Sequence, residues 1–305
     1  MKQNQASRTA EYMALFRALE SFRPADRRLF EDRFAREFLR PSLRIVAHLS
    51  RAPLFGVLIP WVIDHRWPGA RASGIARTRF IDEALAKAIA DGIEQVVILG
   101  AGFDCRAYRI PGIERVHIYE VDHPSTLAAK REHLRRVLHG LPPHVVFAEI
   151  DFNQQQIKEV LAASGFDTTR RTFFIWEGVT NYLSEQAVDT TLRFISTTGA
   201  GSRLIFTYVH RGLLDHSAEF ERTRNLMRLL RKADEPWTFG LYPAELPAYL
   251  EASGFELVED IGSVEYRARY MSPHGKHIKG YEFYRVALAS VVRFYNSNKK
   301  MDDEK

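Results

Sequence analysis

Gly100 and Gly102 form a Gly-x-Gly turn directly after residues 95–99, an apolar run that predicts a buried strand. Glycines let the backbone approach a ligand closely, and ligands of open α/β sheets bind at the carboxyl ends of strands. A tight turn without a ligand is the alternative, because Gly-x-Gly alone is a weak motif. Cys105 stands where the dinucleotide fingerprint has its third glycine, and no Gly-Lys-Ser/Thr follows. The turn therefore disfavours NAD, FAD and a P-loop.

Carboxylates follow the next two apolar runs. Glu120 and Asp122 lie about twenty residues after Gly100, where a carboxylate can accept hydrogen bonds from both ribose hydroxyls. Spacing alone does not separate these two residues. Asp151 and Phe152 end the following run, and an acid beside an aromatic ring suits adenine. Solvated carboxylates and helix caps are the alternatives at both places.

A cation and an anion flank the same turn in the expected fold. Glu177 follows the apolar run 172–176, and Arg77 and Arg79 precede the run that leads to Gly100. Glu177 suits an ammonium group, and an arginine can hold a carboxylate through two parallel hydrogen bonds. The combination fits a zwitterionic amino-acid tail, although a helix-surface salt bridge is the usual role of a single arginine.

Other polar residues are candidates for the side of the site that binds a second substrate. Tyr182 follows Glu177, while His210 and Arg211 come just after the apolar run 203–209. His210 and Arg211 could equally form surface pairs. His274 and His277 share a loop but lack a third ligand, so we expect no metal site. Cys105 is expected to pack beside the turn rather than to act as a nucleophile.

The periodicity predicts strands alternating with helices from residue 73 onward. Such alternation indicates an α/β fold with a largely parallel sheet covered on both faces, and the last two strands are too close in sequence for anything but an antiparallel pair. The expected strands are 95–99, 116–121, 145–150, 172–176, 203–209, 255–259 and 282–289; the expected helices are 74–90, one from Pro124, one between 150 and 172, 184–197, 213–232 and 243–253.

Residues 1–72 contain amphipathic helices interrupted by prolines, and no convincing strand. This segment is expected to form a helical lid over the site, with a permanent core layer as the alternative. The core is expected to span 73–295 with a helical insertion around 211–241, followed by a polar tail, 296–305.

Four segments together resemble the leucine carboxyl methyltransferase family, including polyketide carboxyl O-methyltransferases of the tetracenomycin type and mycobacterial S-adenosylmethionine-dependent methyltransferases. The segments are Arg77-Thr-Arg-Phe-Ile-Asp82, Leu99-Gly-Ala-Gly-Phe-Asp104 with Arg106, Tyr119-Glu-Val-Asp-His-Pro124 and Glu177-Gly-Val-Thr-Asn-Tyr-Leu183. The resemblance extends from about Thr9 to Ala289. It implies a Rossmann-like class I methyltransferase fold: a seven-stranded, mostly parallel sheet with an antiparallel last strand, helices on both faces and an N-terminal lid.

The same resemblance implies roles for the candidate residues toward S-adenosylmethionine. Arg77 would bind the methionine carboxylate, Glu177 its amino group and Asp122 the ribose, while Gly100 supplies backbone contacts. Adenine would lie against Asp151 and Phe152, although relatives commonly have leucine at the latter position. Arg79 and Glu120 are weaker candidates for this cofactor.

Composition restricts the partners. The net charge is +5, from 43 basic and 38 acidic residues, but the arginines alternate with carboxylates and no RNA-binding motif is present. We therefore expect no nucleic-acid partner. A single cysteine excludes an internal disulfide, and no segment looks like a signal peptide or a membrane span. We expect a cytoplasmic enzyme of undetermined oligomeric state.

These observations predict an O-methyltransferase that acts on a carboxyl or hydroxyl of a small molecule, an anionic one included, of the secondary-metabolite type. No acid–base dyad is evident, and a carboxylate acceptor needs none because it is already ionised at neutral pH. Arg211 and Arg267 could hold such an anion. The alternatives are methylation of a peptide or protein C-terminus, an NAD(P)-dependent oxidoreductase, and a binding protein without catalysis.

Overall fold

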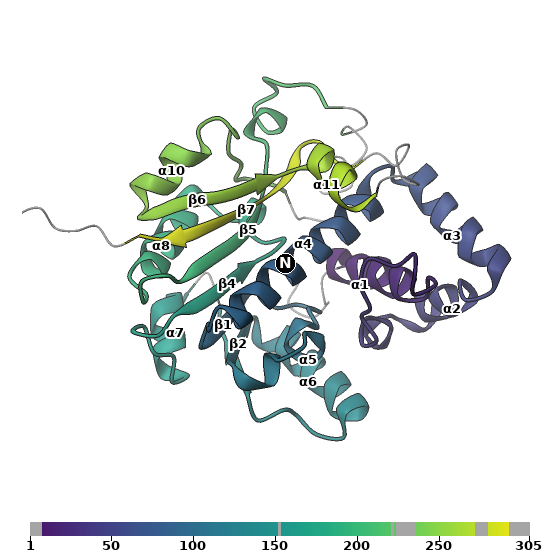
Figure 1. Cartoon of the computed structure of the whole chain (residues 1–305), viewed down its shortest axis with the longest axis horizontal. Coiled ribbons are helices and arrows are strands. Elements are labelled where there is room, and N and C mark those ends of the chain that lie inside the picture. Colours follow the sequence, from purple (N-terminus) through teal and green to yellow (C-terminus); the bar gives the residue numbers. More distant parts are fainter. Residues whose placement is uncertain (1–7, 152–153, 221–222, 224–235, 272–279, 293–305) are drawn as a thin grey trace, which may run out of the picture.

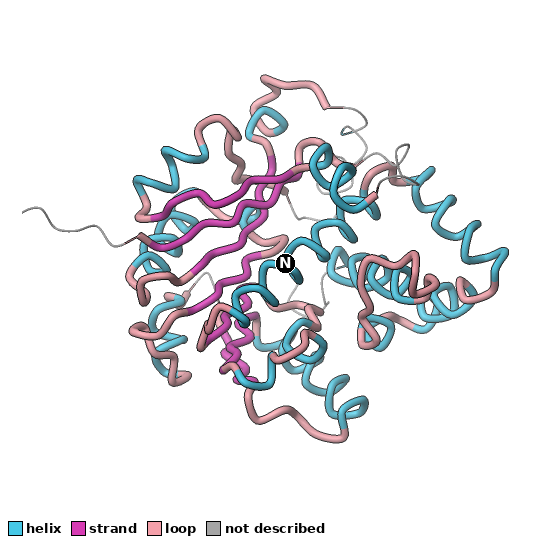
Figure 2. Tube along the Cα trace, viewed as in Figure 1, coloured by secondary structure: helices cyan, strands magenta, loops and turns pink. Residues whose placement is uncertain are grey.

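The computed structural model is built around one seven-stranded sheet with helices on both faces (Figures 1 and 2). It describes residues 8–151, 154–220, 223, 236–271 and 280–292. The strand order is β3-β2-β1-β4-β5-β7-β6. All neighbouring strands pair in parallel except β7, which is antiparallel to both β5 and β6. This arrangement confirms the α/β class, the seven mostly parallel strands and the antiparallel last strand expected from the sequence.

The strands form where the sequence is apolar without interruption. All five residues of β1 and all five of β4 are buried, as expected of central strands covered on both sides. Most bounds agree with the expectation to within one or two residues. The strands are β1 Gln95–Leu99, β2 His117–Asp122, β3 Val145–Glu149, β4 Thr172–Trp176, β5 Arg203–Val209, β6 Phe255–Ile261 and β7 Tyr284–Val291.

The helices form two layers with separate hydrophobic cores. One core unites alternate residues of the central strands with α1, α4, α5, α6 and α11, and the other unites the remaining residues with α7, α8 and α10. The central helices are α4 Ala70–Ala90, α5 Arg106–Arg109, α6 Pro124–Leu138, α7 Ile157–Ala163, α8 Glu185–Ser196, α10 Leu246–Ala252 and α11 Ser263–Tyr270.

The N-terminal segment comprises α1 Arg8–Ser21, α2 Pro41–Leu49 and α3 Pro53–Arg66, and it lies beyond α4 on one side of the sheet (Figure 1). Prolines begin both α2 and α3, where a missing N–H costs no hydrogen bond. Helix α1 contributes Ala14, Leu15, Ala18 and Leu19 to the core that it shares with α4. Helix α4 begins at Ala70, three residues before residue 73, where the core was expected to begin.

The expected insertion helix 213–232 falls mostly outside the described residues. The described residues there form a short 3-10 turn, Arg211–Leu213, followed by turns and bends to residue 220, so the expectation that a helix begins at residue 213 is wrong. None of the described helices is both long and apolar enough to cross a membrane.

Candidate functional site

The glycine turn follows β1 and has a backbone that favours glycine at both positions. The φ angles of Gly100 and Gly102 are +67° and +40°, in a region that side chains disfavour. A Cβ on Gly100 would also overlap Val179 Cγ2, whereas a Cβ on Gly102 would meet only ordinary contacts at 3.7 Å or more. The sequence motif does not distinguish the two glycines, but the close approach that requires glycine, to Val179, is at Gly100.

Asp122 lies at the end of β2, directly beside this turn. Its carboxylate accepts hydrogen bonds from the backbone N–H groups of Gly102 and His123, both at 2.6 Å. Burial raises the pKa of Asp122, and the two N–H donors oppose that shift. The residue that the family resemblance suggested for ribose therefore holds the glycine turn in place as well.

Glu120, the weaker ribose candidate, lies elsewhere. It is fully buried beneath the turn and forms an ion pair with Lys130 Nζ of α6 at 2.9 Å. The same Nζ donates to the carbonyl oxygen of Ala101 at 3.2 Å. Glu120 is thus enclosed within the layer between sheet and α6, and Asp122 is the carboxylate at the strand end.

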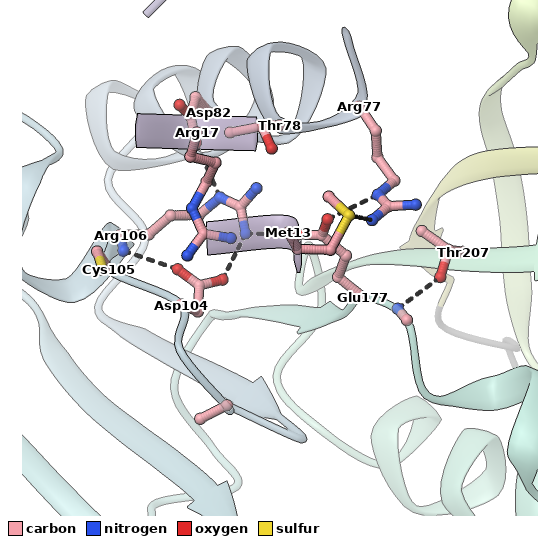
Figure 3. Close-up of polar contacts among 12 residues, drawn as sticks. Met13, Arg17, Arg77, Thr78, Asp82, Asp104, Cys105, Arg106, Glu177 and Thr207 are labelled. Atoms are coloured by element: carbon pink, nitrogen blue, oxygen red, sulfur yellow. Dashed lines mark hydrogen bonds and ion pairs between the residues drawn. The ribbon is translucent and has the colours of Figure 1, made fainter. Parts of the chain in front are cut away.

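Glu177, after β4, lies between two arginines that come from different elements (Figure 3). Arg77 Nε of α4 donates to Glu177 Oε1 at 2.6 Å, and Arg106 Nη1 of α5 donates to Oε2 at 2.7 Å. Burial would raise the pKa of the Glu177 carboxyl, but the guanidinium groups of Arg106 and Arg77 lower it to about 2. Glu177 is therefore ionised at physiological pH.

Arg106 extends this ion pair into a buried network. It also pairs with Asp104 in the glycine turn and with Asp82 of α4, the latter at 2.8 Å. Burial opposes the charge of Arg106, but these carboxylates raise its pKa well above the usual value. The wider network balances four arginines against four carboxylates: Arg17, Arg77, Arg106 and Arg109 with Asp32, Asp82, Asp104 and Glu177.

Helix α1 covers the glycine turn. Arg17 donates to Asp32 at 2.9 Å and to the backbone oxygen of Phe103, next to Gly102, at 2.5 Å. Met13 Sδ lies 3.6 Å from Arg77 Nη2, and both side chains point toward Glu177 in Figure 3. The N-terminal segment thus contributes side chains to the site as well as covering it.

Several candidate residues lie away from this centre. Arg79 forms an i,i+4 ion pair with Glu83 at 2.7 Å on the surface of α4, the ordinary role that the sequence allowed for it. Asp151 follows β3 and is partly buried, and its backbone N–H donates a hydrogen bond to Gln155 Oε1 at 2.9 Å. Phe152 lies outside the described residues, as do His274 and His277.

The acceptor-side candidates follow β4 and β5. Tyr182 ends a 3-10 turn, Thr180–Tyr182, and is partly buried. His210 is packed against Phe220 and Tyr242, and burial lowers its pKa. Arg211 instead turns toward α8, donating to the Gly240 carbonyl at 3.0 Å and pairing with exposed Glu185 at 3.3 Å.

Two further expectations concern single residues. Arg267 is partly buried in α11 and has no ion-pair partner within the described part of the chain. Cys105 is buried and burial raises its pKa well above the usual value, so its thiol is protonated and packs beside the turn. Among the described residues there is no group of three or more histidine, cysteine or acidic side chains placed to hold a metal.

Sequence reasoning gave no role to Arg17, Arg109 or Lys130. A usable signal exists for the first: Arg17 occurs on the apolar face of α1, one turn from Met13. A charged residue on a buried helix face needs a partner, and the partner of Arg17, Asp32, is in a loop that no helical periodicity reveals.

Comparison with known proteins decides the family. Residues 10–196, more than half of the chain, match the family described as leucine carboxyl methyltransferase. The chain belongs to this family. All four segments that carried the resemblance lie inside the matched range, and the turn, Asp122 and Glu177 lie there too.

Relatives along most of the chain carry a consistent description. YktD of Bacillus subtilis, provisionally named as an S-adenosyl-L-methionine-dependent methyltransferase, is 27% identical over 210 residues, covering 68% of this chain and 69% of YktD. A protein of Mycobacterium tuberculosis with the same description is 31% identical over 217 residues, covering 70% and 68% of the two chains.

Two solved structures share the fold. A provisionally assigned methyltransferase from Thermobifida fusca superposes with a TM-score of 0.56 at 16% identity, covering 92% of this chain and 94% of that one. A DUF574 family protein from Streptomyces avermitilis gives a TM-score of 0.53 at 14% identity, covering 91% and 97%.

Proposed function

We propose that this methyltransferase transfers the methyl group of S-adenosylmethionine to a carboxyl or hydroxyl oxygen of a small molecule of the secondary-metabolite type. The observation that carries the cofactor assignment is the Arg77–Glu177 ion pair beside the glycine turn. A zwitterionic amino-acid tail inserted there would exchange one ion pair for two, its carboxylate on Arg77 and its ammonium on Glu177. The names of the relatives support the same cofactor.

The residues around the turn fit the rest of that molecule. Asp122 stands at the strand end, with carboxylate lone pairs beyond the two N–H bonds available for ribose hydroxyls. Gly100 lets the turn pass close to Val179, and Asp151 borders the region proposed for adenine. Bound S-adenosylmethionine would supply an electrophilic methyl on a sulfonium.

The chain's own contribution to the transfer is proximity, alignment and exclusion of water. A carboxylate acceptor arrives ionised, so no residue must remove a proton from it. For a hydroxyl acceptor, His210 is the candidate base, because its lowered pKa leaves the imidazole neutral at pH 7. Arg267, which lacks an ion-pair partner among the described residues, is the candidate for holding an anionic acceptor.

We also propose that residues 1–72 act as a lid. Arg17 and Met13 of α1 contact the turn and Arg77, so a movement of α1 would open this side of the site and its return would exclude water. Limited proteolysis should cut residues 23–51 more slowly when S-adenosylhomocysteine is bound. Equal cleavage with and without it would favour a permanent layer.

Two other functions compete with this proposal. Methylation of a peptide or protein C-terminus would use the same cofactor site with a larger acceptor. An NAD(P)-dependent oxidoreductase is disfavoured because Cys105 occupies the position at which a dinucleotide requires glycine.

A thermal-shift comparison separates the cofactor classes. S-adenosylhomocysteine should raise the melting temperature and NAD(P) should not; the reverse result would overturn the proposal. A methyl-transfer screen over carboxylate and phenol metabolites, with a C-terminal peptide included, then identifies the acceptor by mass spectrometry. Methylation of the peptide alone would replace the small-molecule assignment.

A further inference from the structure

Helix α3 presents an apolar face to solvent. Six of its residues on one side are exposed by 38% to 72%, and all are large hydrophobic residues. They fall within about 160° of helical arc at 3.6 residues per turn. We call them the α3 face: Leu54, Phe55, Val57, Leu58, Trp61 and Val62.

The opposite side of the same helix attaches it to the protein. Ile63 is buried in the core that α1 and α4 share, and Ile59 packs against that core. Helix α3 is therefore held in place by one side, and the α3 face is the side that points away. In Figure 1 the helix lies at the margin of the molecule, farthest from the sheet.

The size of the α3 face exceeds what a free surface normally shows. Its six side chains expose on the order of 700 Å², whereas the largest apolar patch on a typical monomer covers about 300–600 Å². A standard interface buries about 800 Å² on each partner. A face of this area on a protein in water indicates that another surface covers it.

The charges around α3 identify the kind of surface. The arc of the α3 face holds no lysine, arginine or carboxylate, and its one further exposed residue is His65, stacked on Trp61 with 5.0 Å between ring centroids. Two copies of the face can therefore meet across a twofold axis without opposing permanent like charges. Its flanking cations are engaged within the chain: Arg51 lies over the ring of Phe22 and Arg66 over the ring of Trp67. A membrane-surface helix instead directs a lysine- and arginine-rich rim at the headgroups.

Asp64 also favours a second protein copy over a membrane surface as the partner of the α3 face. It flanks the α3 face and pairs with Arg71 of α4 at 2.5 Å, so Arg71 is engaged within the chain as well. This edge of the face therefore presents an acid–base pair, and not a free lysine or arginine, to an anionic lipid surface. We propose that the α3 face is the interface through which two copies of this chain form a dimer, with α3 packed antiparallel on its twofold-related copy.

The dimer would also anchor the segment that covers the cofactor site. Trp67, directly after α3, contacts Tyr12 of α1 with 6.1 Å between ring centroids. Helix α1 carries the Met13 and Arg17 contacts to the site. The interface proposal does not depend on methyl transfer, because it rests on α3 alone.

Analytical ultracentrifugation of the full chain tests the interface. Wild type should sediment as a dimer, and Val57→Glu as a monomer with a dissociation constant raised at least about 100-fold, because each substitution enters the interface twice and buries two unpaired carboxylates. The matched control is Val264→Glu in α11, where the valine is 59% exposed compared with 72% for Val57. The control should remain a dimer, and circular dichroism should show both variants folded.

Three outcomes would overturn the proposal. The first is a wild-type monomer at about 100 μM, well above the dissociation constants of specific dimers. The second is a dimer that survives Leu54→Glu/Val57→Glu, which would place the interface elsewhere. The third is a monomer that sediments with phosphatidylserine–phosphatidylcholine vesicles and loses this binding in Val57→Glu, which would assign the α3 face to a membrane.

Discussion

Arg106 and Glu177 form an ion pair of 2.7 Å although 71 residues separate them in the chain. The same guanidinium group reaches Asp82 and Asp104, so one side chain joins α4, the glycine turn and the end of β4. Arg106 need not touch the cofactor to matter for its binding. It fixes the carboxylate that is proposed to receive the cofactor's amino group, and we regard it as a positioning residue.

Replacing Arg106 should cost both stability and cofactor affinity. Arg106→Gln leaves three buried carboxylates without their shared cation, and we expect a loss of about 3–5 kcal/mol in the free energy of unfolding measured with urea. Arg106→Lys keeps the charge but not the forked geometry, so it should fold and bind S-adenosylhomocysteine more weakly. The control is Arg136→Gln, which breaks an exposed i,i+4 pair with Glu132 and should cost about 0–1 kcal/mol. Equal losses for the Arg136 and Arg106 variants would contradict the network.

The Arg77–Glu177 pair should recognise only the amino-acid end of the cofactor. Arg77→Met is therefore expected to weaken S-adenosylhomocysteine by about 1–3 kcal/mol in calorimetric titrations. Methylthioadenosine, which has the nucleoside but no zwitterion, should bind the variant and the wild type alike. If the variant lost the same affinity for both ligands, Arg77 would support the fold of the site and would not bind the amino-acid end of the cofactor.

The two carboxylates of β2 should separate binding from stability. Asp122→Ala is expected to weaken S-adenosylhomocysteine by about 1–3 kcal/mol while the far-ultraviolet dichroism stays native. Glu120→Gln removes the partner of a fully buried lysine, so it should lower the free energy of unfolding by about 3–5 kcal/mol. The assignment would be contradicted if Asp122→Ala bound S-adenosylhomocysteine as tightly as the wild type while a folded Glu120→Gln no longer bound it.

The sequence predicted that functional residues gather at this end of the sheet, but not which of Glu120 and Asp122 faces the site. Apolar runs are long enough to predict each strand, and the carboxyl ends of parallel strands meet at one edge, so Gly100, Asp122 and Glu177 were predicted to gather. Side-chain direction needs the register: Glu120 pairs with Phe147 of β3 on one side and Ile98 of β1 on the other, and it points to the face that α6 covers. Lys130, its partner, reads in the sequence as an ordinary surface lysine.

The buried charge network could not be predicted from the sequence for a similar reason. Most of its ion pairs join residues that are far apart in the chain, such as Arg106 with Asp82 or with Glu177. Local periodicity carries no information about such distances. The family resemblance included the motif around Asp104 and Arg106 but did not indicate that these two side chains form an ion pair.

The two glycines of the turn should differ in their tolerance of a side chain. Gly100→Ala places a Cβ in the left-handed region and against Val179, so it should lower the melting temperature and abolish binding of S-adenosylhomocysteine. Gly102→Ala adds only the backbone strain, about 1–2 kcal/mol. Adding Val179→Ala to Gly100→Ala should recover part of the lost stability. No recovery, or a more damaging Gly102→Ala, would show that the overlap with Val179 is not what requires glycine.

The low pKa of Glu177 predicts a loss of stability in acid. Its folded-state pKa of about 2 lies below the ordinary value of 4.5, so its contribution is complete above about pH 4.5 and disappears as the pH falls toward 2. That separation corresponds to about 3 kcal/mol, since each tenfold change in proton affinity is worth about 1.4 kcal/mol. In urea unfolding, the free energy of unfolding should decrease as the pH is lowered from 7 to 3. The decrease should be steeper in the wild type than in Glu177→Gln, because the variant has no carboxylate at this position to take up a proton. Parallel profiles for the two proteins would mean that Arg77 and Arg106 do not hold Glu177 ionised.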